Sequence, residues 1–154
     1  MAENKHRMAY NWTMSLEVAK GAESILRGIH QLDGREDWCF AVWLMPEGSS
    51  PLPALPSEAH EFLQAAGSSS AMTIAMTNAT PQNGDTHSQY TIGKPWHGLE
   101  SPCEVSVKWN GGGTTVFENE VFTADEAAPI FTHYLEHNTV PAEFELRLID
   151  TNSY

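Results

Sequence analysis

Three residues near the C-terminus have the types and spacing of a zinc-binding helix. His133, Glu136 and His137 match the pattern H-x-x-E-H. Two imidazoles four residues apart face the same side of a helix, where they can share a metal while the glutamate polarises water. However, no third ligand follows on a helix, and His133 lies on the polar side of the apolar stripe. A small metal-dependent hydrolase therefore stays an alternative, and we predict no catalytic residue, no metal and no cofactor.

Two other features that could do chemistry have simpler explanations. The glycine run at 111–113 is followed by residues typical of a strand. A phosphate-binding loop would lead into a helix N-terminus instead, so these glycines predict a hairpin turn. Cys39 and Cys103 lie in apolar, strand-like runs without an adjacent histidine. We expect buried, reduced thiols, which are typical of a cytoplasmic protein.

The charge of the chain limits the partners it can bind. The 154 residues include 8 Lys and Arg against 20 Asp and Glu, a net charge of -12. Nucleic-acid binding needs clustered basic residues, so we expect no direct contact with nucleic acid. Residues 1–40 are nearly balanced, and the excess of acid falls in the remaining 114. These acids either keep a sheet edge soluble or attract a basic partner.

Length and hydropathy predict one domain over residues 1–154. No window approaches the ~18 consecutive apolar residues of a membrane span. The first twelve residues include basic side chains without a following apolar run. We therefore expect neither a secretory signal nor a membrane contact, and a cytoplasmic location.

The first half of the chain predicts strands and two helices. Residues 10–16 favour a strand, and apolar residues at helical spacing favour a helix over 18–30 with Ser15 as a possible N-cap. The continuous apolar run at 38–45 is typical of a central strand covered on both faces. Four prolines predict a loop over 46–56. A second helix should follow Ser57, with its apolar face formed by Ala59, Phe62, Leu63 and Ala66.

The second half predicts more strands and one capped helix. Residues 70–77 alternate, Tyr90 and Ile92 indicate another strand, and 103–109 form the first arm of a hairpin. In the return strand, a two-residue turn would place Val116 opposite Val107, and a three-residue loop would place Phe117 there. We favour Phe117 facing inward.

A capping box starts the third helix, and a last strand ends the chain. Thr123 and Glu126 form the box, and the helix buries a stripe that includes Phe131 and Tyr134. In the last strand, Leu146 and Leu148 alternate with polar residues. The elements predict an α+β fold, with a mixed, mainly antiparallel sheet of about six or seven strands and two or three helices packed on one side.

The run at 106–146 resembles one family of bacterial polymorphic-toxin immunity proteins, often found beside toxins of the deaminase superfamily. The shared elements are a hairpin with a glycine turn, a short acidic segment, a capped helix with an aromatic residue near its end, and a proline before the last strand. In this chain the acidic segment holds Glu118 and Glu120, the cap is Thr123, and the proline is Pro141.

The resemblance implies a non-enzymatic protein that binds a cognate toxin and covers its active site. Such a toxin acts on nucleic acids or nucleotides and often has a basic cleft. An acidic adaptor or nucleic-acid mimic is a further alternative. From charge and expected exposure, we place the contact on the acidic hairpin and on the loop at 94–98. The predicted partner-binding residues are Glu100, Glu104, Glu118, Glu120, Trp96 and His97.

Overall fold

A computed structural model describes residues 6–11, 13–18, 21–44, 61–79 and 87–149. Its elements, in chain order, are β1 (His6–Tyr10), β2 (Met14–Glu17), α1 (Ala22–Gln31), β3 (Cys39–Leu44), β4 (Phe62–Ser68), β5 (Ala71–Ala79), β6 (His87–Gly93), β7 (Glu104–Trp109), β8 (Gly112–Phe117), η3 (Glu118–Glu120), α2 (Ala124–His137) and β9 (Glu145–Ile149). Seven strands form one sheet in the order β2-β1-β3-β4-β5-β6-β9, and β7 pairs with β8 in a separate two-stranded sheet. Every pairing within these sheets is antiparallel.

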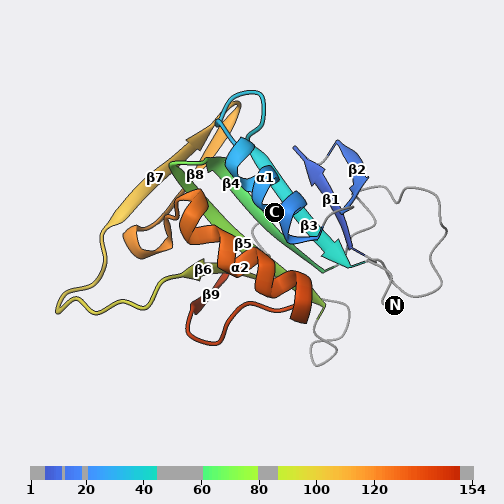
Figure 1. Ribbon diagram of the computed structural model, residues 1–154. Helices are drawn as coiled ribbons and strands as arrows, with labels where there is room; N and C mark the ends of the chain where they lie inside the picture. Colours follow the sequence, from blue (N-terminus) through green and yellow to red (C-terminus); the bar gives the residue numbers. More distant parts are fainter. Residues whose placement is uncertain (1–5, 12, 19–20, 45–60, 80–86, 150–154) are drawn as a thin grey trace.

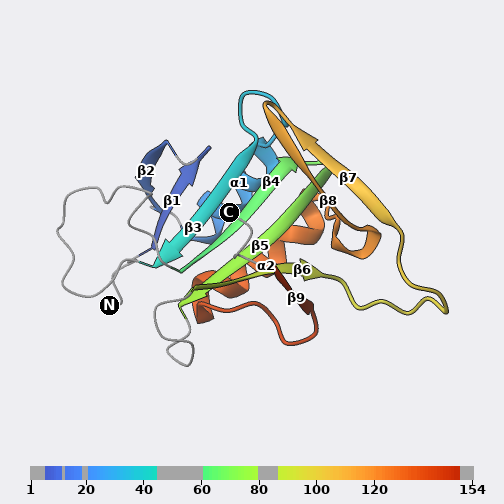
Figure 2. The ribbon, with the colours of Figure 1, turned by 180° about the vertical axis from the view of Figure 1, so that it is seen from behind.

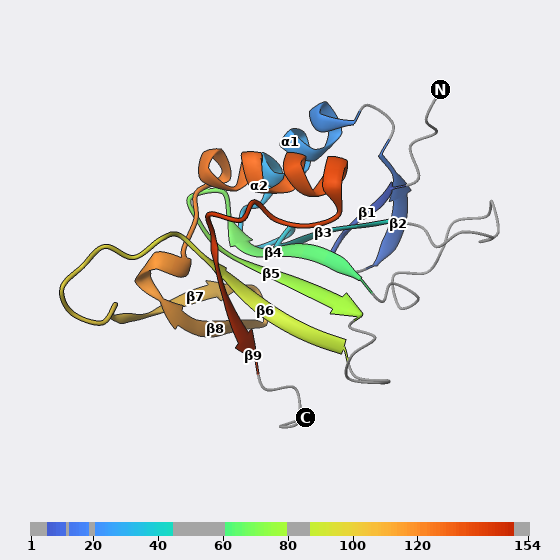
Figure 3. The same ribbon diagram turned by 90° about the horizontal axis from the view of Figure 1, so that it is seen from below.

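The elements form three layers. Both helices cover one face of the large sheet (Figure 1), and the β7–β8 hairpin lies on the opposite face (Figures 2 and 3). The predicted α+β fold, with helices packed on one side of the sheet, is therefore confirmed. The sheet that the structure describes is wholly antiparallel rather than mixed.

The main core lies between the helices and the sheet. On the sheet side, Phe40, Leu63 and Ile74 are fully buried, and α1 contributes Ile25 and Ile29. The predicted stripe of α2 is confirmed, because its buried residues are Ala124, Ala127, Ile130, Phe131 and Tyr134. Side chains at this spacing share one side of a helix, so each helix buries its apolar face against the strands.

Three local predictions agree with the structure. Thr123 Oγ1 accepts the Glu126 N–H at 3.2 Å, and Glu126 accepts the Thr123 N–H at 2.9 Å, which confirms the capping box. In β5 the buried residues include Met72, Ile74 and Met76, as the alternation predicted. Strand β3 lies in the interior of the sheet and is buried on both faces.

The N-terminal prediction is wrong in detail. Instead of one strand over 10–16, β1 and β2 form a hairpin, with Tyr10 opposite Met14. Asn11 adopts the left-handed conformation at φ 54°, which asparagine tolerates better than most residues. Ser15 does not cap the helix, because it lies in β2 opposite Ala9. Helix α1 begins after Gly21, which makes no side-chain capping bond.

The second predicted helix is wrong, because its residues from Phe62 onward form a strand. Residues 62–68 form β4, which pairs with β3 on one side and β5 on the other. Pairing on both edges satisfies the backbone of an interior strand, and this outweighs the high helix propensity of residues such as Ala65 and Ala66. Ser57, Ala59 and the predicted loop at 46–56 lie outside the described residues.

The hairpin has a register that the sequence did not predict. Residues 110 and 111 form a two-residue turn, with Gly111 at φ 81°. Val107 lies opposite Thr114, whereas both registers considered above placed another residue there. The inward orientation favoured for Phe117 is also wrong, because Val116 is 4% exposed and Phe117 is half-buried.

The last strand is confirmed, but it lies at the edge of the sheet. β9 pairs with β6 alone within the described residues. Leu146 and Leu148 are 47% and 61% exposed, because this edge extends beyond the cover of α2 (Figure 3). Alternation correctly predicted the strand, but it does not reveal how far a covering helix reaches.

Two histidines join distant elements and should respond oppositely to pH. His6 is buried, with its Nε2 2.9 Å from Asn138 Oδ1, and burial lowers its pKa despite this bond. His30 joins α1 to the start of α2, with its Nε2 3.0 Å from Asp125 Oδ1. Hydrogen bonds to the Leu26 carbonyl and then to Asp125 raise the pKa of His30.

We expect NMR titration to place the pKa of His6 below 6.5 and that of His30 above it. The stabilisation from protonated His30 is complete below its ordinary pKa and is lost as pH rises through the raised value. The His30→Gln variant should therefore lose more unfolding free energy at about pH 5.5 than at about pH 8, by less than ~1 kcal/mol for such an exposed pair. Burial lowers the pKa of His6, so protonation of His6 opposes folding, and its contribution to the free energy of unfolding should increase as pH rises toward 6.5. The His6→Gln variant should lose this increase. Identical pH profiles for all three proteins would contradict both assignments.

Candidate functional site

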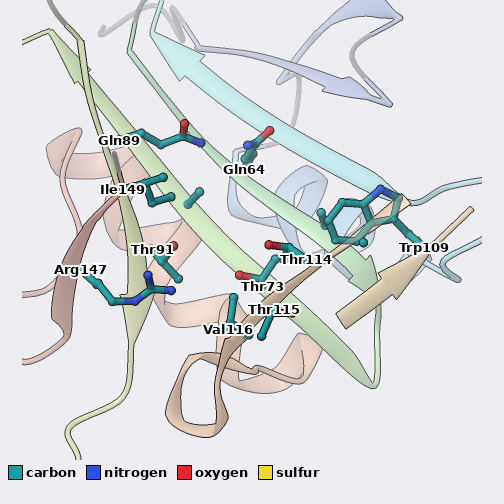
Figure 4. A pocket seen from close by; sticks show the side chains of 13 residues that line it. Gln64, Thr73, Gln89, Thr91, Trp109, Thr114, Thr115, Val116, Arg147 and Ile149 are labelled. Carbon is teal, nitrogen blue, oxygen red and sulfur yellow. The ribbon is translucent and has the colours of Figure 1, made fainter. Parts of the chain in front are cut away.

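A groove of about 390 Å³ lies between the β7–β8 hairpin and the face of the large sheet opposite the helices. Its lining residues come from β4, β5, β6, β7, β8 and β9, and their side chains converge on the groove (Figure 4). The lining residues are Gln64, Ala66, Thr73, Ala75, Gln89, Thr91, Trp109, Gly113, Thr114, Thr115, Val116, Arg147 and Ile149. Two of these residues are glutamines and four are threonines, so the groove can hydrogen-bond a polar ligand.

The floor of the groove follows from the register of the sheet. Gln64, Ala75, Thr91 and Arg147 lie directly opposite one another on β4, β5, β6 and β9. Residues in register on one face stand side by side. The short side chains of Ala75 and Thr91 lie in the middle of this row, and the longer Gln64 and Arg147 stand at its ends. The groove therefore exists because the central strands carry small residues on this face.

The hairpin forms the wall of the groove and is seated by close packing. Gly67 of β4 makes room for it, because a Cβ atom there would lie 3.1 Å from Val107 Cγ1. At the turn end, the rings of Trp38 and Trp109 are stacked, with centroids 6.2 Å apart and planes 6° apart. These contacts fix β8 over the floor, and four consecutive residues of β8 then line the groove.

Arg147 is the only lining residue with a charged side chain, and its charge is balanced. Its Nε and Nη2 each donate to the carboxylate of Glu120 at 2.8 Å. The guanidinium also lies 5.1 Å from the centroid of the Phe117 ring. The hydrogen bond to Glu120 raises the pKa of Arg147, so the guanidinium stays protonated. The groove is thus close to neutral within a strongly acidic protein.

The second surface is the connection at 94–103, which projects from the body of the molecule between β6 and β7 (Figures 1 and 3). Trp96 organises this loop. Its indole N–H donates to the Glu100 carbonyl at 2.7 Å, and its backbone N–H donates to the Glu145 carboxylate at 3.0 Å. Gly98 lies against the Trp96 ring, where a Cβ would lie 2.6 Å from the Cζ2 atom. Leu99 is fully exposed, which leaves an apolar side chain beside Glu100.

Five of the six predicted partner-binding residues are exposed, either on the connection at 94–103 or on the adjoining residues Glu104 and Glu118. Glu100, Glu104, Glu118 and His97 are exposed, and Trp96 is 37% exposed. Glu118 accepts the Cys103 N–H at 3.1 Å, which brings it to the base of the loop. Whether these residues bind a partner stays a prediction.

The exposure expected of Glu120 is wrong. Glu120 is 3% exposed, because its carboxylate folds back to accept the Phe117 N–H at 2.8 Å and is held by Arg147. Arg147 lies 27 residues further along the chain, so no local pattern predicted this pair. We therefore leave Glu120 out of the proposed partner surface.

The three residues of the alternative zinc-binding pattern, His133, Glu136 and His137, come together only in part. The rings of His133 and His137 have centroids 4.4 Å apart, and His137 Nε2 lies 3.7 Å from Glu136 Oε2. Across the residues that the structure describes, no group of three or more His, Cys, Asp or Glu side chains could hold a metal ion. These residues do not fit a zinc site, because a pair of histidines with one outward glutamate does not complete a metal centre.

The two cysteines differ from each other. Cys39 is buried, as expected, and its thiol lies with Sγ 3.7 Å from Gln64 Oε1. Cys103, in contrast, is exposed. The burial expected of Cys103 is wrong, because it precedes β7 at the base of the projecting loop.

The groove was not predicted from the sequence. Its floor residues Thr73 and Ala75 alternate with the buried methionines of β5, and such positions ordinarily face solvent. The alternation could have indicated a polar sheet face. It could not indicate that the hairpin would be placed over that face.

Comparison with known proteins found no match. No protein-family model, no curated protein and no solved structure matches the chain. Neither helix in the described residues is long and apolar enough to cross a membrane.

Proposed function

We propose that this protein is an immunity protein that binds a cognate bacterial toxin and blocks its active site. The observation that supports this most directly is the projecting loop, which presents the fully exposed Leu99 next to Glu100. An exposed apolar side chain beside a carboxylate suits insertion into a basic, substrate-binding cleft. A toxin that acts on nucleic acids or nucleotides would have such a cleft, and the complex would form in the cytoplasm.

Charge supports the same mechanism. The net charge of -12 favours rapid association with a basic partner through long-range attraction. The loop is also ordered by its own contacts at Trp96 and Gly98, so little conformational entropy would be lost on binding. A stoichiometric inhibitor needs a prearranged surface of this kind rather than a catalytic centre.

The test begins with a tagged protein expressed in its own host, whose bound partner is identified by mass spectrometry and purified. Reversing Glu100, Glu104 and Glu118 together to lysine should weaken the 1:1 complex at least ~100-fold at low salt and flatten its salt dependence. The same variant should no longer protect cells that express the toxin. Leu99→Asp should also weaken binding, with a smaller change in salt dependence.

The matched control reverses Glu36, Glu136 and Glu143, which are exposed elsewhere and give the same change in net charge. This variant should bind within about threefold of the wild type, because charges outside an interface mainly affect the encounter rate. Equal losses in both triple variants would reduce the effect to net charge and reject the proposed surface. A bound partner whose toxicity is unaffected by this protein would reject the immunity function and favour an adaptor.

A further inference from the structure

We propose that the groove binds an extended, uncharged peptide segment, which adds as a strand to the free edge of β8. This inference is independent of the acidic loop and of the toxin, since it uses a different surface. It assigns a second macromolecular contact to the face of the sheet opposite the helices.

The edge of β8 carries unpaired backbone groups. Within the described residues, β8 pairs with β7 alone. In a hairpin with a two-residue turn, the residues flanking the turn form a hydrogen-bonded pair, and bonded and non-bonded pairs then alternate. Trp109 and Gly112 flank the turn, so the N–H and C=O groups of Gly113 and Thr115 point away from β7.

One observed hydrogen bond supports this alternation. Phe117 is the next residue in the same series, and its N–H donates to the Glu120 carboxylate rather than to β7. At Phe117 the outward backbone donor has a partner within the chain. At Gly113 and Thr115 the outward groups face the groove instead, because residues 113–116 line it consecutively. A strand that turned only one face toward the groove would contribute every second residue to its lining. Because β8 contributes four consecutive residues, its edge faces the groove.

The dimensions of the groove suit a short extended segment. Four consecutive residues of β8 line the wall, and at ~3.3 Å per residue they offer an edge of roughly 13 Å. An added strand of about four residues matches that length. Its side chains would alternate between solvent and the floor, where Thr73, Thr91 and Gln89 offer hydrogen-bonding groups above the small Ala75.

The charge of the lining selects the kind of peptide. The positive charge of Arg147 is already neutralised by two hydrogen bonds to Glu120. A charged side chain entering the groove would lose hydration without gaining an opposite charge. Small uncharged residues such as Ser, Thr, Ala and Val are therefore expected. Pairing between two copies of β8 is disfavoured because each copy carries a net charge of -12.

A random heptapeptide library displayed on phage would supply the probe, with the full chain as bait and the Thr115→Pro variant for counter-selection. Proline removes the outward N–H of Thr115 but no bond to β7, because residue 115 lies in a non-bonded pair. Synthetic copies of the enriched peptides should bind the wild type with a Kd measurable by fluorescence anisotropy. Thr115→Pro should weaken binding at least ~10-fold, and the matched Thr115→Ala, which keeps the N–H, should stay within about twofold.

Scanning the selected peptide by N-methylation gives a readout specific to strand addition. Methylation of every second amide should weaken binding at least ~10-fold, and methylation of the amides between should have little effect. A second variant, Ala75→Leu, narrows the floor of the groove without changing β8 and should also abolish peptide binding. It provides the test if Thr115→Pro does not fold.

Four results would overturn the proposal. The first three are the absence of any enriched peptide, binding that survives Ala75→Leu, and a methylation scan without a period of two. A dimer of the wild type that dissociates in Thr115→Pro, seen by sedimentation equilibrium, would assign the edge to a second copy and also overturn it.

Discussion

Replacing Gly67 with alanine is expected to lower the free energy of unfolding by about 3 kcal/mol or more. Gly67 has φ +128°, a conformation that L-residues rarely adopt. A Cβ atom would overlap the Ala71 carbonyl oxygen, and it would also lie 3.1 Å from both Met72 Cα and Val107 Cγ1. Two of these three neighbours are backbone atoms, so β4, β5 and the hairpin would have to separate.

Urea unfolding followed by circular dichroism measures this effect. Gly111→Ala is the matched control, since Gly111 also has a positive φ, +81°, but no heavy atom lies within 4 Å of its Cβ position. The control isolates the backbone cost, which should be about 1 kcal/mol. The difference between the two variants then reports the close packing at Gly67. Equal losses of unfolding free energy in Gly67→Ala and Gly111→Ala would contradict the close packing of the hairpin and β5 against Gly67.

Replacing Glu120 with alanine is expected to cost about 2–4 kcal/mol of unfolding free energy. The Glu120 carboxylate is buried, holds Arg147 in two hydrogen bonds and accepts the Phe117 N–H. Its loss leaves a backbone donor and a guanidinium without their partner. Because the Arg147 side chain is 41% exposed, water can partly replace the lost bonds, which limits the effect to this range.

A double-mutant cycle separates the pair from its surroundings. Glu120→Ala, Arg147→Met and the double variant should give a coupling free energy of at least ~1 kcal/mol. Glu118→Ala is the control, because its exposed carboxylate lies two residues away and makes a single bond to the Cys103 N–H. It should cost no more than about 1 kcal/mol. Additive effects of the Glu120 and Arg147 substitutions would show that the two side chains act independently.

The two candidate surfaces can be tested separately. The acidic surface is carried by the projecting loop and the adjoining end of the hairpin, whereas the groove lies over the central strands (Figures 1 and 4). Charge reversal at Glu100, Glu104 and Glu118 leaves every groove residue unchanged, and Thr115→Pro leaves these carboxylates unchanged. Loss of one contact can therefore be measured while the other serves as an internal control of folding.

Local patterns in the sequence determined several elements of this protein. Alternation identified β5, the continuous apolar run identified β3 as an interior strand, and Thr123 with Glu126 identified the start of α2. Each of these features depends on residues within one turn or one strand, so neighbouring residues carry the information. The fold class followed from them, because amphipathic helices and strands must bury their apolar faces against one another.

Features that depend on distant residues were decided only by the tertiary structure. Residues 62–68 have apolar side chains at helical spacing, yet they form β4 because β3 and β5 pair with both of its edges. The hairpin register depends on which residues form the turn as well as on their number, and the structure places the turn at residues 110 and 111. Packing of Val107 against Gly67 accompanies the register that the structure shows.

The difference between local and long-range information also explains which parts of the two candidate surfaces could be predicted. Exposed carboxylates such as Glu100, Glu104 and Glu118 could be predicted, because acidic residues face water by default. The burial of Glu120 could not be predicted, because its partner Arg147 belongs to the last strand. The groove required the register of four strands and the position of the hairpin above them. Sequence determined the chemical character of each segment, and the tertiary structure decided which segments meet, because pairing energies arise between residues far apart in the chain.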